Sequence, residues 1–198
     1  RVLYFGLAFP SNNAVLPDSP LFEERFRDEG IAFDLDEANR LLDEMGLAER
    51  DRNGIRKLPD GRPMEIIVET AGENPIEIDA LELVRDDWRA VGVDLYPKPS
   101  QRDVLRNRAF SGDLVMSVWS GFDNGIPTPR MSPDERVPVS TVFLAGPAWG
   151  AWVMSRGESG QAPDFPPARR LLDLHDAWIA STDPEEQAGI WKESLSIH

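Results

Sequence analysis

One stretch of the sequence, residues 33–70, constrains the fold more than any other. It reads FDLDEANRLLDEMGLAERDRNGIRKLPDGRPMEIIVET. Asp34 followed three residues later by Glu37 is a capping-box pattern, which predicts the start of a helix. Gly46 suits a left-handed stop at its end. Between these points apolar residues recur at helical spacing, at Leu35, Ala38, Leu41, Leu42 and Met45.

Turn signals and a strand follow this predicted helix. Asn53-Gly54 and Pro59-Asp60-Gly61 tolerate positive φ, so the chain between them can fold back into a polar hairpin. Residues 64–70 are apolar and β-branched enough for a buried strand. The stretch therefore predicts a helix, a hairpin and a strand in that order.

Strands and helices alternate further along the chain. Asn74 and Pro75 start a helix that ends at Gly92. A strand at 93–97, a helix at 100–108 capped by Ser100, and a strand at 113–119 come next. This alternation with short joins favours a parallel α/β sheet with right-handed crossovers.

The two ends of the chain have other patterns. Residues 1–31 are rich in proline and predict irregular structure, and residues 121–167 form a long Pro/Gly-rich connection. Long irregular segments in compact domains are usually functional or mobile. Residues 166–198 predict two helices, the second with Thr182 and Glu185 as its capping box.

Composition excludes several classes of function. A net charge of −14 argues against binding to nucleic acid or to anionic membranes. The chain has no cysteine and two histidines, and its carboxylates do not cluster, so the sequence predicts no metal site. It shows no phosphate loop and no nucleophile motif, and we expect no cofactor.

Residues 33–70 resemble the C-terminal lobe of the family 5 extracellular solute-binding proteins, the oligopeptide- and dipeptide-binding receptors of ABC importers. That family repeats a helix ending in A-x-x-L-L-D-E-x-G, an Asn/Asp-Gly loop, Leu-Pro-Asp-Gly-Arg/Lys-Pro and a strand, as this chain does. The resemblance implies an α/β fold. It would be a periplasmic-binding-protein type II-like lobe with a mostly parallel sheet flanked by helices, a long irregular connection and C-terminal helices.

The resemblance also implies how the chain is divided. Residues 1–198 would be a single C-terminal lobe, a fragment of a larger two-lobe receptor. In chain order, its parts would be an irregular lead-in from the crossover (1–31), a helix-hairpin-βαβαβ core (34–119), a long loop region (121–167) and C-terminal helices (166–198).

Ligands bind at the carboxyl ends of the strands in open α/β sheets. Three segments qualify: 70–74, 97–100 and 119–124. The last holds the first four candidate binding residues, Trp119, Phe122, Asp123 and Asn124. In the family a Trp here is followed three residues later by an Asp that pairs with a peptide's terminal amine. Phe122 occupies that place and the acid follows at Asp123, which leaves open a solute without a free amine.

Trp149 and Trp152 are two further candidate binding residues. They look like a Trp-Gly-x-Trp segment of one subgroup of the family. The two indoles can stack on sugar rings or on ligand side chains. The alternative, that they pin the long loop to the core, is the one we favour, since buried aromatic side chains stabilise strongly.

The resemblance implies ligand binding without catalysis. The chain would belong to the substrate-binding component of an ABC transporter, which captures an extracytoplasmic solute by closure of two lobes. Expected partners are a small solute (a peptide or an oligosaccharide), a membrane permease and the N-terminal lobe, in the periplasm or tethered outside the membrane. Alternatives are the same fold binding an oligosaccharide or an opine, and an α/β hydrolase or transferase.

Overall fold

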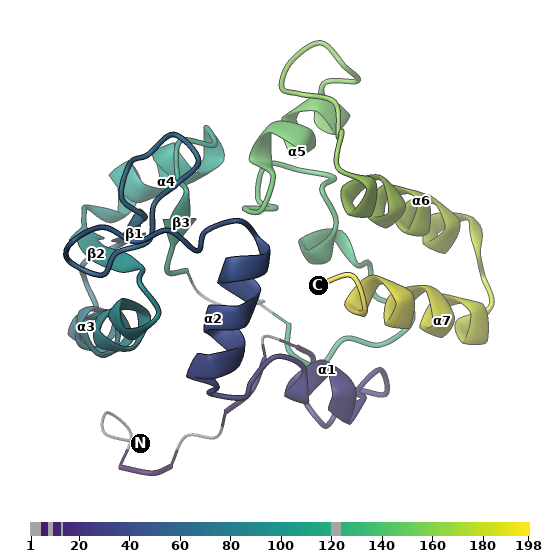
Figure 1. Ribbon diagram of the computed structural model, residues 1–198. Coiled ribbons are helices and arrows are strands. Elements are labelled where there is room, and N and C mark those ends of the chain that lie inside the picture. Colours follow the sequence, from purple (N-terminus) through teal and green to yellow (C-terminus); the bar gives the residue numbers. More distant parts are fainter. Residues whose placement is uncertain (1–4, 8–9, 13, 120–123) are drawn as a thin grey trace. The chain divides into compact units, whose positions relative to one another are not determined.

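A computed structural model of the chain describes residues 5–7, 10–12, 14–119 and 124–198. These residues contain a three-stranded parallel sheet and seven α-helices, which confirms the predicted α/β class (Figure 1). They form two compact units. The first unit takes in the described parts of 1–9, 32–107 and 114–119, and the second those of 10–31, 108–113 and 120–198. That residues 1–198 make up one lobe, with the subdivisions given above, stays a prediction.

The predicted helix after Phe33 is present as α2 (Leu35–Glu44). The Asp34 carboxylate accepts a hydrogen bond from the Glu37 backbone N–H at 2.9 Å, and Gly46 has φ +84°. In contrast with its strong apolar spacing, α2 contains no buried residue. Leu35, Leu41 and Met45 are 37%, 46% and 71% exposed, so the apolar face of this helix is only partly packed.

A buried arginine also attaches α2 to the rest of the first unit. Arg56 lies in the hairpin after α2 and its side chain is 1% exposed. It forms an ion pair with Asp43 of α2, and its Nη2 donates to the Asn39 side-chain oxygen at 2.8 Å. Its Nη1 donates to the Leu47 carbonyl oxygen at 2.7 Å. Several charge-assisted hydrogen bonds thus converge on one side chain.

The sheet has the order β2-β1-β3, with β1 at Glu65–Thr70, β2 at Asp94–Pro99 and β3 at Met116–Ser117. Both pairings are parallel, and the register joins Glu65 to Asp94 and Thr70 to Pro99. The carboxyl ends of β1 and β2 are therefore level. This edge of the sheet is the place where the fold can present a ligand site.

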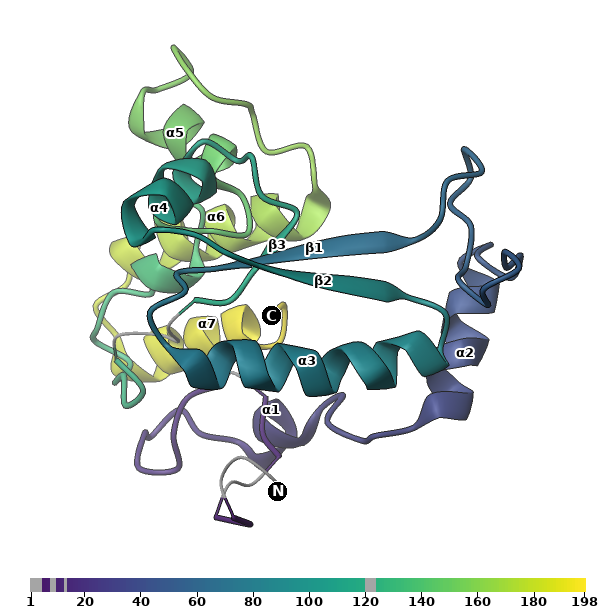
Figure 2. The same ribbon diagram turned by 90° about the vertical axis from the view of Figure 1, so that its left-hand side faces the viewer.

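Helix α3 (Pro75–Ala90) follows β1 and runs alongside the sheet (Figure 2). The Asn74 side chain accepts from the Ile76 N–H at 3.1 Å, which confirms the predicted cap. Val68, Leu81 and Leu95 form the buried cluster between helix and strands. Helix α4 (Arg102–Phe110) follows β2.

Three element boundaries predicted from the sequence are wrong. Helix α4 begins at Arg102 and not at Ser100. The Ser100 hydroxyl contacts the carbonyl oxygens of Thr70 and Gln101, so it does not cap this helix. Strand β3 is only two residues long, since it pairs with Val68 and Glu69 alone. The last helix is capped by Asp183, whose carboxylate accepts from the Glu185 N–H at 3.0 Å, and not by Thr182.

The second unit is helical. Its elements in the described residues are α1 (Glu24–Asp28), a 3-10 turn (Asp134–Arg136), α5 (Pro147–Met154), α6 (Pro166–Ala180) and α7 (Pro184–Leu195). Helices α6 and α7 pack on each other (Figure 1). Helix α5 lies inside the connection that the sequence predicted to be irregular. None of the helices in the described ranges is long and apolar enough to cross a membrane.

Candidate ligand-binding site

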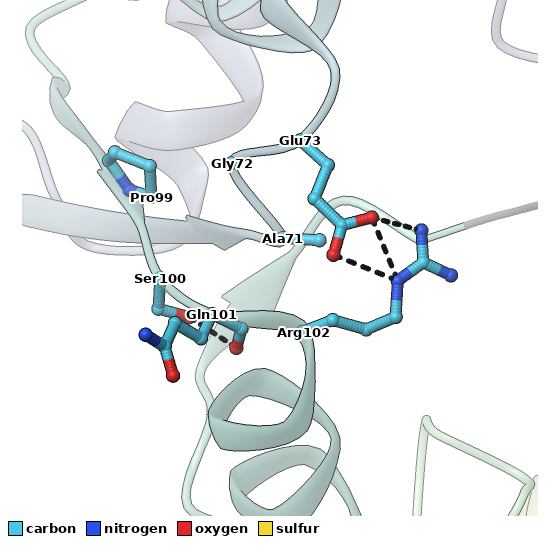
Figure 3. Close-up of a pocket in the computed structure, with 7 residues that line it drawn as sticks. All are labelled: Ala71, Gly72, Glu73, Pro99, Ser100, Gln101 and Arg102. Atoms are coloured by element: carbon cyan, nitrogen blue, oxygen red, sulfur yellow. Dashed lines mark hydrogen bonds and ion pairs between the residues drawn. The ribbon is translucent and has the colours of Figure 1, made fainter.

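A pocket lies at the carboxyl ends of β1 and β2, entirely within the first unit (Figure 3). Its volume is about 480 Å³, and it is open to solvent. The loop that joins β1 to α3 lines it, together with the segment from the end of β2 to the start of α4. The lining residues are Ala71, Gly72, Glu73, Pro99, Ser100, Gln101 and Arg102.

One backbone hydrogen bond joins the two segments that line the pocket, and a second hydrogen bond fixes the turn after β1. The Ser100 N–H donates to the Thr70 carbonyl oxygen at 3.0 Å, and the Gly72 N–H donates to the Thr70 hydroxyl oxygen at 3.1 Å. Gly72 has φ +66°, and a Cβ there would lie 3.1 Å from the Pro99 Cβ. The positive φ and this close contact both favour glycine at this position.

One ion pair joins the two walls of the pocket. Arg102 Nη2 lies 2.6 Å from a Glu73 carboxylate oxygen, and Arg102 Nε lies 3.0 and 3.2 Å from the two carboxylate oxygens (Figure 3). The hydrogen bond from Arg102 holds the pKa of Glu73 below its ordinary value, and Glu73 raises the pKa of Arg102. Both groups are thus charged at neutral pH.

The remaining polar groups of the pocket are uncharged. They are the Ser100 hydroxyl and the Gln101 side-chain amide, with the backbone of residues 71–73. Within the part of the chain that the structure describes, the Gln101 amide makes no side-chain hydrogen bond. The pocket can therefore offer donors and acceptors to a solute, and it contains no nucleophile with an adjacent base.

Of the four candidates after the third strand, the two that the structure describes, Trp119 and Asn124, do not line this pocket. Trp119 is 38% exposed and belongs to the first unit. Phe122 and Asp123 lie outside the described residues. Asn124 belongs to the second unit, where its side-chain oxygen accepts from the Ile126 N–H at 2.9 Å in a local turn. A binding role for these residues stays a prediction.

Trp149 and Trp152 lie on α5 in the second unit. Trp149 packs against the buried cluster of Val137, Phe143 and Leu171, and its ring stacks on Phe165 at a centroid distance of 6.2 Å. A Cβ at Gly146 would lie 2.1 Å from the Trp149 ring. These contacts support the structural interpretation of Trp149, while the binding interpretation of both indoles stays a prediction.

Two of the three strand-end segments predicted from the sequence, 70–74 and 97–100, line the pocket. The individual residues that carry its charge, Glu73 and Arg102, were not among the candidates. A signal for both was present in the sequence, because Glu73 directly precedes the predicted cap Asn74 and Arg102 lies at the start of the helix that follows the next strand. Among the described residues, no group of three or more acidic or histidine side chains is placed to hold a metal ion.

Comparison with solved structures gives close relatives of the fold. An oligopeptide-binding protein, OppA, matches 100% of the chain at 28% identity and a TM-score of 0.83. NikA from Brucella suis, solved with Fe(III)-EDTA, matches 84% of it at 25% identity and a TM-score of 0.55. An oligopeptide-binding protein of Thermotoga maritima, solved with mannohexaose, matches 94% at 18% identity and a TM-score of 0.64, which supports the fold alone.

The chain spans about a third of the length of these proteins, with 32% of OppA, 30% of NikA and 34% of the Thermotoga protein covered. No curated protein matches the sequence significantly. The family model of bacterial extracellular solute-binding proteins, family 5 Middle, matches residues 1–134. That family binds solutes outside the cytoplasm and is not enzymatic. The chain belongs to the bacterial extracellular solute-binding proteins of family 5.

Proposed function

We propose that the chain is part of the substrate-binding component of an ABC importer and that its pocket contributes one wall of the solute site. The observation that carries this proposal is the position of the pocket at the carboxyl ends of β1 and β2, where α/β folds bind ligands. A cavity that is open to solvent suits a site that a second lobe closes. The remaining partners are then the N-terminal lobe and a membrane permease, and the receptor is located in the periplasm.

We propose a peptide or an oligopeptide as the solute. The 28% identity to OppA over the whole chain supports this choice. An oligosaccharide is the second candidate. The uncharged polar groups of the pocket, Ser100 and Gln101, favour it, because hydroxyl and amide groups are suitable partners for sugar hydroxyls.

Blocking the pocket in the intact receptor tests the proposal. Gln101→Trp places a large side chain in the pocket, while Asp87→Trp places the same side chain on an exposed position of α3. Calorimetry with blocked and unblocked tetrapeptides and a mannose hexasaccharide identifies the solute. We expect Gln101→Trp to weaken its binding at least about tenfold and Asp87→Trp to leave it unchanged. Native affinity in Gln101→Trp, with thermal unfolding as in the parent protein, would place the site elsewhere.

A further inference from the structure

The two charged side chains of the pocket, Glu73 and Arg102, are bound to each other. Nε and Nη2 of Arg102 and both carboxylate oxygens of Glu73 take part in the pair (Figure 3). Glu73 lies in the loop before α3 and Arg102 is the first residue of α4, and the two side chains are 55% and 62% exposed. An exposed pair of this kind is weak, so its main effect is on the charge that the pocket presents to a solute.

We infer that the Glu73–Arg102 pair makes this pocket select an uncharged, hydrogen-bonding part of the solute over a charged end group. Main-chain amides of a peptide and hydroxyl groups of a sugar belong to this class. The inference rests on the proposed function, since it names the chemistry of the solute part that binds in the same pocket.

The electrostatic reason lies in the short distance between the two charges. An anionic group that approaches Arg102 also approaches the Glu73 carboxylate 2.6 Å away, so attraction and repulsion nearly cancel. To bind Arg102 directly, the anion must displace Glu73. That carboxylate would then be unpaired in a cleft that closes, which is unfavourable. The same reasoning applies to an ammonium group and Glu73.

Uncharged groups meet no such obstacle. The Gln101 amide can donate two hydrogen bonds and accept two, and the Ser100 hydroxyl can donate one and accept two. The hydroxyl's two contacts with backbone carbonyl oxygens, 3.4 and 3.5 Å long, are weak enough to exchange for a solute. A neutral amide or hydroxyl of the solute can therefore bind here while the ion pair stays intact.

Charge-matched probes on the intact receptor test the inference. One tetrapeptide is used in three forms, with both ends blocked, with only the amine free and with only the carboxylate free. A mannose hexasaccharide and its terminal uronate serve as the second set. Calorimetry at neutral pH compares the parent protein with Glu73→Gln, Arg102→Gln and the double variant, in which both charges are removed together.

We expect the parent protein to bind each neutral probe at least about fivefold more tightly than its charged forms. Glu73→Gln releases Arg102 and should tighten the anionic probes selectively. Arg102→Gln releases Glu73 and should tighten the amine-bearing probe selectively. The double variant should bind the neutral probes like the parent protein, which separates charge selection from a general effect on the loops.

Equal shifts for all probes in both single variants would overturn the inference, as would a parent protein that prefers a charged probe. The pocket-blocking variant Gln101→Trp distinguishes this failure from failure of the proposed function. If Gln101→Trp abolishes binding but the charge variants treat all probes alike, the pocket binds solute and only the inference is rejected. If Gln101→Trp binds the neutral probe normally, or if no probe binds, both are rejected.

Discussion

The Arg56 guanidinium donates a hydrogen bond from Nε to the backbone carbonyl oxygen of Val91 at 2.7 Å, and so joins the hairpin after α2 to the end of α3. Gly92 and Val93 connect Val91 to β2, whose far end lines the pocket. A buried polar network therefore fixes the beginning of the strand that carries one wall of the candidate site.

Replacing Arg56 should destabilise the first unit strongly. In Arg56→Met the carbonyl oxygens of Val91 and Leu47 lose their buried donor, and we expect unfolding to become easier by about 3 kcal/mol. Arg56→Lys should also destabilise, because an ammonium group cannot reproduce the planar fork of donors. Urea denaturation followed by circular dichroism measures both.

The matched control is Arg52→Met in the same hairpin, at an exposed position. Its free energy of unfolding should change by less than about 0.5 kcal/mol. Equal effects of the two substitutions would mean that the Arg56 network does not stabilise the unit.

A side chain at Gly92 should destabilise the first unit. It has φ +88°, and a Cβ there would lie 2.8 Å from the Arg56 Cγ and 2.9 Å from the Arg50 Nη1. Gly61 has a similar φ of +85° but open space around it. Alanine at Gly61 should therefore lose about 1–2 kcal/mol from the backbone conformation alone. Gly92→Ala should lose at least about 1 kcal/mol more, since the arginine network must move.

Thermal unfolding of the two alanine variants separates these effects. Equal losses of stability in the two variants would show that Arg50 and Arg56 adapt without strain. That result would contradict a rigid arginine network around Gly92.

Local sequence signals predict many of the helix caps and turns of the first unit. They predict fewer of the elements of the second unit. Asp34, Asn74 and Gly46 act where the sequence predicts them, because caps and positive-φ stops depend on near neighbours. Helix α5 was missed because Pro147 and two glycines in its region resemble a loop. The burial of Arg56 was also missed, since a hairpin arginine with turn residues on both sides is typical of an exposed position.

The pocket was predicted at the level of loops but not of side chains. Parallel pairing brings strand ends together, so segments 70–74 and 97–100 could be named from the order of elements alone. That Glu73 meets Arg102 depends on the register Thr70–Pro99. No pattern within either loop encodes that register, because it is set by packing of the whole sheet on α3.

The pKa of Glu73 should rise when its partner is removed. Arg102 lowers this pKa, so the pair stabilises the folded state above the unfolded-state pKa of Glu73, and this contribution is lost as the pH falls through the lower folded-state pKa. A carbon-detected NMR titration of Arg102→Gln should show the Glu73 pKa shifted upward towards its ordinary value. Glu37, whose pKa is lowered by Arg40, should not change and serves as the internal control.

Trp149 should matter for stability in the absence of solute. Its ring packs on the cluster of Val137, Phe143 and Leu171 and stacks on Phe165, so Trp149→Ala should lower the free energy of unfolding by about 3 kcal/mol. Trp149→Phe, which keeps an aromatic ring, should recover part of this loss. An unchanged unfolding midpoint in Trp149→Ala, together with weaker solute binding, would favour the binding interpretation.

Hydrogen–deuterium exchange of the intact receptor with and without its solute tests the central claim most directly. If the pocket at the ends of β1 and β2 is a wall of the solute site, amides in residues 71–73 and 100–103 should exchange more slowly in the complex. The amides of the hairpin turn at residues 52–54, which do not line the pocket, should not change. Unchanged exchange around the pocket, with protection elsewhere in the receptor, would contradict the account.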